Sequence, residues 1–197
     1  MSIRTEPDPI VLFEEWCAEA HSCKAIAEPT AMTLATVDDS GMPAARVVLL
    51  KAYDGRGFVF YTNLSSPKVR QLDANPKAAL CFYWMPLDKQ IRVQGLVERV
   101  TDAEADAYFA TRPRQSQIGA WASKQSQPYT ERLELEKRLL KYTAKFGLGA
   151  VPRPPFWSGF RVVPETIEFW LKQPFRLHDR VLYTRHEDVW TRTRVFP

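Results

Sequence analysis

The sequence predicts a mainly β protein with peripheral helices, of the α+β class. Short runs of β-branched and aromatic residues recur along the chain, separated by turn signals such as DDSG at 38–41 and DGRG at 54–57. Helical spacing or helix-start signals interrupt this pattern in only a few places. A sheet of many short strands has unpaired backbone groups on its edge strands. Closing a mostly antiparallel sheet into a barrel, with helices outside, would pair those groups. The 197 residues contain no internal repeat, so we expect one domain spanning 1–197.

The first third of the chain is expected to contain an arm, one helix and three strands. Residues 1–9 are polar and contain prolines, which is typical of a short mobile arm. From residue 9 to about 27, apolar side chains recur at helical spacing and predict an amphipathic helix. An antiparallel meander is then predicted from strands at 32–37, 46–51 and 58–62. Arg46 and Lys51 stand at the two ends of one strand, so a regular pleat would send them to opposite faces of the sheet.

The remaining elements alternate between helices and strands. Ser66 and Pro67 predict a helix that runs to about residue 74, because Ser caps the first amides and Pro suits the first helical position. The residues TDAE at 101–104 form a capping box, which predicts a helix to about 111. A longer helix is expected over about 130–146, with one apolar stripe and a charged face that includes Arg132. Further strands are expected at 78–84, 90–100, 159–163, 166–171, 180–185 and 189–195.

The charge balance is basic. Lys plus Arg number 27 against 23 Asp plus Glu, which gives a formal charge of +4, and 17 of the bases are Arg. The planar fork of Arg donors suits phosphate and carboxylate, so the composition is compatible with anionic ligands as well as with a solvated basic surface. Nucleic acid is a third partner that a basic protein could bind, but the chain has no recognised nucleic-acid motif and no dense Lys/Arg run.

Several classes of protein and site are excluded by simple patterns. No apolar run approaches the ~20 residues of a membrane helix, and the N-terminus lacks the apolar core of a signal peptide. Cys17, Cys23 and Cys81 have neither zinc-site spacing nor a disulfide framework, so we expect reduced thiols and a cytoplasmic protein. The three histidines form no metal-ligand cluster, so no metal is expected. The phosphate loops GxGxxG and GxxxxGK and the hydrolase motifs GxSxG and HExxH are also absent.

Basic and hydroxyl residues on the predicted strands and at their ends remain as candidates. Arg46 and Lys51 bracket a strand, and Lys68 lies in the first turn of a helix, where amides and dipole favour an anion. The stretch 108–126 is polar for its length, so it is either a surface loop or a ligand-binding loop. The segment RLHDR at 176–180 places one histidine between arginines, which fits either a surface hairpin or a catalytic group.

Five segments together resemble the pyridoxine (pyridoxamine) 5′-phosphate oxidases. The matching segments are RVVLLK (46–51), VFYTN (59–63), TRPRQSQIGAWASKQS (111–126), FWSGFRV (156–162) and IEFW…RLHDR (167–180). They occur in order and with matching spacing, and the resemblance runs from about residue 8 to residue 197. It implies a split β-barrel FMN-binding fold that forms a homodimer.

The resemblance also implies a role for individual residues. Residues that match contacts of the FMN phosphate and ribityl chain are Arg46, Lys68, Gln125 and Ser126. Residues that match contacts of the isoalloxazine are Val47, Val48, Leu49, Leu50, Lys51, Tyr61, Thr62 and Gln90, with Trp170 and Arg180 contributed across the dimer. Residues that match contacts of the substrate phosphate are Lys51, Tyr108, Arg112 and Ser116. The pair Arg176 and His178, with Leu177 between them, matches the catalytic residues beside the pyridine ring.

The activity implied is FMN-dependent oxidation of pyridoxine 5′-phosphate or pyridoxamine 5′-phosphate to pyridoxal 5′-phosphate, with O2 as acceptor and H2O2 as product. Two departures from the family pattern stand out. Pro67 occupies the position of a family Arg, which removes a cation beside Lys68 unless Arg70 compensates, and the N-terminal arm is short, with Arg4 as its only base. Alternatives are a related split-barrel flavin oxidase acting on another ring, such as the phenazine-pathway relatives, or a non-catalytic flavin-binding or pyridoxal-phosphate-binding protein. Two bound phosphates would bring about −3 to −4 charges and nearly cancel the net charge of +4.

Overall fold

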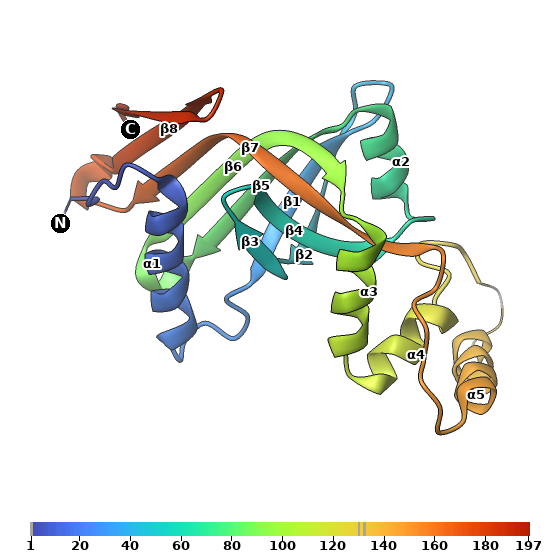
Figure 1. The fold of residues 1–197 in the computed structure, drawn as a ribbon. Helices are drawn as coiled ribbons and strands as arrows, with labels where there is room; N and C mark the ends of the chain where they lie inside the picture. Colours follow the sequence, from blue (N-terminus) through green and yellow to red (C-terminus); the bar gives the residue numbers. More distant parts are fainter. Residues whose placement is uncertain (1, 130, 132) are drawn as a thin grey trace.

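A computed structural model describes residues 2–129, 131 and 133–197 and shows a curled antiparallel sheet with helices around it (Figure 1). The sheet has nine strands, in the order β2-β1-β5-β6-β7-β4-β3, with β8 and β9 added beside β7. The strands are β1 (Ala31–Val37), β2 (Pro43–Leu49), β3 (Ala52–Asp54), β4 (Gly57–Asn63), β5 (Lys77–Trp84), β6 (Lys89–Arg99), β7 (Trp157–Leu171), β8 (Asp179–His186) and β9 (Val189–Arg194). The helices are α1 (Pro9–Ser22), α2 (Pro67–Ala74), α3 (Asp102–Thr111), α4 (Arg114–Ala122), α5 (Glu134–Phe146) and the short 3₁₀ turns η1 (Met85–Leu87) and η2 (Pro174–Arg176).

The long strand β7 organises the sheet. It pairs with β6 from Phe160 to Leu171, while its first half pairs with β4 and its last third with β8. The β6–β7 register shifts between Gln94 and Gly95. A side chain at Gly95 would place its Cβ 1.9 Å from the Val163 carbonyl oxygen, so this close backbone approach requires glycine. The two strands predicted at 159–163 and 166–171 form the single continuous strand β7.

The main core lies inside the curl and is covered by α1. Asp8 caps this helix by accepting a hydrogen bond from the Ile10 amide. The ring of Phe13 is fully buried and meets the rings of Tyr53, Phe58 and Phe82 edge-on, with centroids 4.9–5.3 Å apart. The helix ends at Ser22, five residues before the end predicted from its apolar spacing.

A second, smaller core joins α3, α4 and α5 to the start of β7. Its buried members are Phe109, Ile118, Val151 and Trp157. Helix α4 was not predicted, because its sequence was interpreted as part of a polar stretch. Helix α5 begins at Glu134 instead of about 130, and positions 130 and 132 of that prediction lie outside the described residues.

The other local predictions agree with the structure in part. The helix at 67–74 and the capping box at 101–104 are confirmed, with Thr101 and Glu104 each bonding the backbone amide of the other. Ser66, however, makes no capping hydrogen bond with its side chain, and its hydroxyl accepts a hydrogen bond from Lys68 instead. Among the described residues, no helix combines the length and the apolar character that crossing a membrane requires.

Residues 2–8, within the segment 1–9 predicted to be a mobile arm, contact the C-terminal strands at several points, and position 1 lies outside the described residues. Ile3 is only 4% exposed, and its amide donates to the Asp179 carboxylate. Farther along, the Glu6 carbonyl accepts hydrogen bonds from Tyr183 and Arg192. Backbone groups of this polar N-terminal segment thus hydrogen-bond to side chains of β8 and β9. The periodicity of the sequence does not predict such long-range contacts.

Candidate functional site

A cavity of about 850 Å³ lies where β2, β4, α2, α3 and α4 meet. Most of the residues predicted to contact FMN or the substrate phosphate line it, from segments far apart in the sequence. The lining residues are Arg46, Val47, Val48, Leu49, Lys51, Tyr61, Thr62, Asn63, Pro67, Lys68, Tyr108, Arg112, Ser116, Gly119, Ala120, Ser123, Gln125, Ser126 and Trp157.

Lys68 supplies a buried positive charge at one end of this lining. Its Nζ donates to Thr62 Oγ1 and Ser66 Oγ, both at 3.1 Å, and to Gln125 Oε1 at 3.4 Å. All three acceptors are neutral, and no carboxylate in the described residues forms an ion pair with this ammonium. Burial lowers the pKa of Lys68, and the nearby charge of Arg46 lowers it further. An anionic ligand would relieve both effects.

Arg46 provides a second cation with neutral partners only. Its Nη1 donates to Thr36 Oγ1 at 2.5 Å and to the Leu34 carbonyl at 3.3 Å, while Nη2 donates to Gln71 Oε1 at 2.9 Å. Burial lowers the pKa of this guanidinium as well. Thr36 on β1 and Gln71 on α2 therefore hold the side chain in place without neutralising it. Together with the first-turn amides of α2, Lys68 and Arg46 form a region suited to a phosphate group.

Lys51 lines the same cavity as Arg46, although a regular pleat would put them on opposite faces. The reason is that β2 ends at Leu49. Leu50 then turns into the main core, with 4% exposure, and Lys51 pairs its amide with the Val59 carbonyl. The predicted strand 46–51 is thus interrupted at its end. The side chain of Leu50 does not line the cavity.

Aromatic rings and one guanidinium make up another part of the lining. The Tyr61 ring stacks on Tyr108, with centroids 4.1 Å apart, and on Trp157, with centroids 5.2 Å apart. Arg112 lies over Trp157, with its Cζ 4.9 Å from the ring centroid, and within 5.5 Å of the Phe109 centroid. Its Nη1 is buried and has no hydrogen-bond partner in the described residues. Burial lowers the pKa of Arg112. A buried donor with no protein partner is free to bind an anionic ligand that enters the cavity.

The other predicted site residues form a second group, away from the cavity. Gln90, Trp170 and Arg180 occupy adjacent positions across β6, β7 and β8. The His178 ring lies 4.6 Å from the Trp170 ring, centroid to centroid. In Figure 1 strand β8, which follows the turn carrying Arg176, lies at the opposite end of the sheet from α2, α3 and α4. Within one chain, the structure therefore does not bring Arg176, Leu177 and His178 to the cavity.

The turn that carries Arg176 has an unusual backbone. Phe175 and Arg176 have φ values of 58° and 63°, a left-handed conformation that costs free energy for residues other than glycine. Phe175 is 92% exposed and Leu177 is 68% exposed. His178 Nδ1 accepts a hydrogen bond from the Gln173 amide at 3.2 Å, so a neutral His178 ring carries its proton on Nε2. Strain and exposed apolar side chains at one turn are typical of a surface built to meet another molecule.

Sequence reasoning missed several residues of the site. Thr36, Gln71 and Ser66 hydrogen-bond to Arg46 or Lys68, and Trp157 contacts Arg112, yet none of the four was assigned a role in ligand binding. Trp157 lies inside the quoted segment 156–162, so a signal was present. The partners of Arg46 come from β1 and α2, and no local pattern marks them. Arg70, considered as compensation for Pro67, is exposed and donates to the Ser65 carbonyl without lining the cavity.

Comparisons with known proteins agree with the expected family. A family model described as pyridoxamine 5′-phosphate oxidase matches residues 19–145. A second model, the pyridoxine 5′-phosphate oxidase C-terminal dimerisation region, matches residues 157–197. A curated pyridoxine/pyridoxamine 5′-phosphate oxidase of Caulobacter vibrioides is 58% identical over 193 residues, which is 98% of this chain and 86% of that protein.

Solved structures agree with the fold. The crystal structure of PhzG from Burkholderia lata 383, in complex with tetrahydrophenazine-1-carboxylic acid, has a TM-score of 0.91 and 32% identity, covering 98% of this chain and 94% of that one. A pyridoxamine 5′-phosphate oxidase-related, FMN-binding protein of Nostoc punctiforme shares the fold with a TM-score of 0.77 at 18% identity, covering 99% of this chain and 100% of that one. The predicted split-barrel, mainly β fold with helices is thereby confirmed. The chain belongs to the pyridoxamine 5′-phosphate oxidase family and is an oxidoreductase of that family.

Proposed function

We propose that this protein binds FMN and oxidises pyridoxine 5′-phosphate or pyridoxamine 5′-phosphate to pyridoxal 5′-phosphate, with O2 as acceptor and H2O2 as product. The observation that carries the proposal is a single cavity lined by two sets of cations, Lys68 with Arg46 and Arg112 with Lys51. Among the described residues, none of the four forms an ion pair with a carboxylate. Each set suits a phosphate ester, which carries about −1.5 to −2 charges near neutral pH. One phosphate belongs to the cofactor and the other to the substrate.

The Lys68 end of the cavity fits FMN. Its buried ammonium and the Arg46 guanidinium have only neutral partners, so the phosphate of FMN would supply the missing negative charge. Gln125 and Ser126 border the same end, and the backbone of 46–51 with the side chains of Val47, Val48 and Leu49, together with Tyr61 and Thr62, would face the flavin ring. When bound, FMN supplies the two-electron chemistry, and the protein holds and orients it.

The Arg112 end fits the phosphate of the substrate. Arg112 offers an unsatisfied donor, Lys51 a second cation, and Tyr108 and Ser116 two hydroxyls. Binding energy gained at this non-reacting group positions the exocyclic carbon of the pyridine ring for oxidation. The name of the Caulobacter vibrioides relative supports the same substrates.

We further propose a homodimer in which the second group of residues from one protomer completes the cavity of the other. All members of the group except Gln90 lie within 157–197, which matches a dimerisation region, and the turn of the group exposes Phe175 and Leu177. Gln90, Trp170 and Arg180 would then contact the flavin, and Arg176 and His178, with Leu177, the pyridine ring. The Gln173 amide holds His178 so that its Nε2–H points away from the bond at Nδ1, available as a donor to the substrate.

The fold and the cysteines support two further parts of the proposal. Strand β7, which begins the C-terminal family match, pairs with β4 and β6 from the N-terminal match, so we propose a single domain over 1–197. Cys17, Cys23 and Cys81 are free thiols, as expected of a protein that works in the reducing cytoplasm.

The test is to purify the protein, record its flavin absorbance, and add each substrate aerobically while peroxide and pyridoxal 5′-phosphate are measured. We expect a flavin spectrum and equal amounts of the two products. A flavin-loaded protein that forms neither product would show that the oxidase proposal is wrong. Tetrahydrophenazine-1-carboxylic acid, the ligand of the Burkholderia lata structure, is assayed in parallel, and its preferential oxidation would favour the phenazine branch. Arg176→Met and His178→Gln should lower turnover more than flavin retention, whereas equal loss of both would indicate a structural role.

A further inference from the structure

Helix α3 lies across β4 and β7 through three residue pairs in register. Glu104 and Tyr108 lie four residues apart on one face of the helix, and Arg112 follows four residues later as the residue that ends it. Glu104 meets Arg161, Tyr108 stacks on Tyr61, and Arg112 covers Trp157. Because Arg161 and Trp157 belong to β7 and Tyr61 pairs with Gly159 between them, the partners also lie on one face of the sheet. We call these three pairs the α3 seam.

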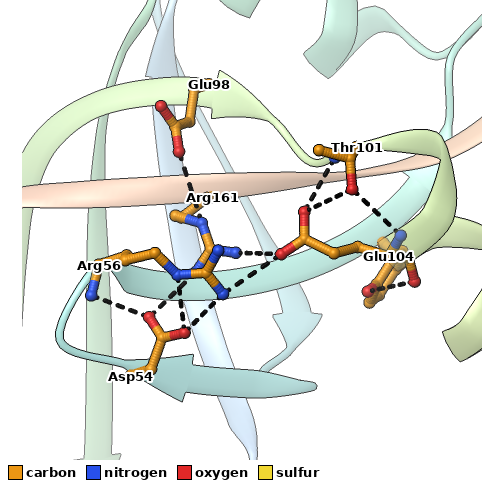
Figure 2. Close-up of polar contacts among 7 residues, drawn as sticks. Asp54, Arg56, Glu98, Thr101, Glu104 and Arg161 are labelled. Carbon is orange, nitrogen blue, oxygen red and sulfur yellow. Dashed lines mark hydrogen bonds and ion pairs between the residues drawn. The ribbon is translucent and has the colours of Figure 1, made fainter.

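Arg161 anchors the end of the seam that is remote from the cavity. Its side chain is 4% exposed and is surrounded by carboxylates, with Nη2 2.8 Å from Glu104 Oε1 and Nη1 3.1 Å from Asp54 Oδ1. Glu98 lies 3.5 Å from its Nε. Figure 2 shows these side chains converging from β3, β6, β7 and α3, with Arg56 on the outer side. The five residues Asp54, Arg56, Glu98, Glu104 and Arg161 are called the Arg161 cluster.

Glu104 connects this cluster to the start of α3. Its Oε2 accepts hydrogen bonds from the Thr101 amide and hydroxyl, while Oε1 faces Arg161. The carboxylate that caps the helix is therefore also the one that ties it to β7. The hydrogen bonds from Thr101 and the charges of Arg161 and Arg56 hold the pKa of Glu104 below its usual range. A buried guanidinium with several acceptors in fixed positions restricts both the rotation and the sliding of the helix.

Space on the sheet makes the middle pair of the seam possible. A Cβ placed on Gly159 would lie 2.7 Å from two atoms of the Tyr61 ring, so only glycine lets the ring lie flat at this point. The flat Tyr61 ring in turn stacks on Tyr108 and on Trp157, at interplanar angles of 12° and 5°. Displacement of α3 would therefore move Tyr108 and Arg112 together, relative to Lys51, which lines the same cavity from the end of β2.

We propose that Arg161 is a positioning residue for the phosphate of the substrate. It does not line the cavity, and it acts through Glu104 and α3 on Tyr108 and Arg112. This inference rests on the proposed function, which assigns Tyr108 and Arg112 to that phosphate. Lys68 and Arg46, the cations proposed to bind the FMN phosphate, are not in the α3 seam, so that phosphate is held independently of Arg161, and Tyr61 is the seam residue shared with the flavin ring.

The experiment compares Arg161→Met with Arg56→Met in the flavin-loaded full chain. Arg56 binds the same two carboxylates as Arg161 but its side chain is 66% exposed, so its loss controls for a change of charge in the cluster. For R161M we expect the KM for pyridoxine 5′-phosphate and the inhibition constant of inorganic phosphate to rise about tenfold, the loss expected when one charge-assisted contact is misplaced. The kcat at saturation and the FMN content should change less than twofold, and R56M should resemble the unmodified protein in every parameter.

Two further variants cover the case in which R161M does not fold. Glu104→Gln keeps a residue that suits the capping box but removes the charge that faces Arg161, and it should raise the same two constants by a smaller factor. Arg161→Lys retains a cation and should recover part of the phosphate affinity lost in R161M. Hydrogen exchange of the α3 amides, measured without substrate, should be faster in R161M and E104Q and unchanged in R56M.

The outcomes separate this inference from the proposed function. Unchanged KM and phosphate inhibition in folded R161M, or a loss of kcat or FMN in parallel, would overturn the positioning role, as would α3 exchange equal to that of the unmodified protein. Failure of the unmodified, flavin-loaded protein to oxidise either substrate would instead overturn the proposed function. In that case the exchange of α3 and the inorganic phosphate affinity, measured by calorimetry, still decide whether Arg161 positions the Arg112 site.

Discussion

Arg112→Met should weaken substrate binding without weakening the ligand-free fold. The guanidinium of Arg112 is partly buried against Trp157 and Phe109, and its Nη1 has no hydrogen-bond partner in the described residues. A buried unsatisfied donor costs about 1–3 kcal/mol. The cation–π contacts with the two rings return about 0.5–2 kcal/mol. Because methionine fills much of the same volume and can pack on the rings, the substitution removes the cost together with the contacts.

The two effects nearly cancel in the free energy of unfolding. We expect the ligand-free variant to differ from the unmodified protein by about −1 to +2.5 kcal/mol, where a positive sign means greater stability. The loss of substrate binding in this variant, in contrast, is not offset by any gain. A hydrogen bond to a charged group contributes about 1.5–3 kcal/mol, which corresponds to about a 10- to 100-fold increase in KM.

The assay pairs urea unfolding of the ligand-free protein with steady-state kinetics on pyridoxine 5′-phosphate. Arg114→Met is the control, because Arg114 lies two positions away and does not line the cavity. Arg114 donates hydrogen bonds to the Gly147 and Gly149 carbonyls, so its substitution should lower stability and leave KM unchanged. A destabilisation of R112M by more than about 2 kcal/mol would show that Nη1 is satisfied in the folded protein. An unchanged KM would show that Arg112 does not contact the substrate.

Three further predictions concern the cofactor end and the acid stability. Lys68→Met should raise the dissociation constant of FMN at least tenfold by losing a charge-assisted contact, whereas Arg70→Met should leave it within twofold, both measured by flavin fluorescence titration; equal effects would mean that Arg70 also holds the cofactor. Pro67→Arg places a cation next to the same site and should tighten FMN binding severalfold at low salt but less at high salt, and an affinity independent of salt would contradict this. The pKa of Asp54 is lowered, because hydrogen bonds from Arg56 and the charge of Arg161 outweigh the effect of burial. The contribution of Asp54 to stability is therefore present above the ordinary carboxyl pKa of about 4, and it is lost as the pH falls below that value. R161M should therefore lose less stability than the unmodified protein between about pH 5 and pH 3 in urea titrations, and parallel pH profiles would refute this account of the cluster.

The sequence determined those features that depend on neighbouring residues. The apolar alternation of β1, the proline at the start of α2 and the capping box of α3 each act within one or two turns or a single strand, and each was predicted close to its observed position. The family resemblance placed Arg46, Lys68 and Arg112 among ligand contacts, and the structure brings all three to one cavity. The polar stretch around α4 was ambiguous, because a helix that lines a cavity with polar residues carries no clear apolar period.

Tertiary structure decided what depends on strand pairing and on burial. Lys51 joins Arg46 in the cavity because β2 stops at Leu49 and the next residue enters the core, an interruption that comes from packing and not from local pattern. The N-terminal arm is held by Asp179, more than 170 positions away in the chain. Arg161 is one of many arginines in the sequence, and only the meeting of β3, β6, β7 and α3 surrounds it with carboxylates. Charges acquire their roles from the partners that folding places around them, and those partners lie beyond the range of any local pattern.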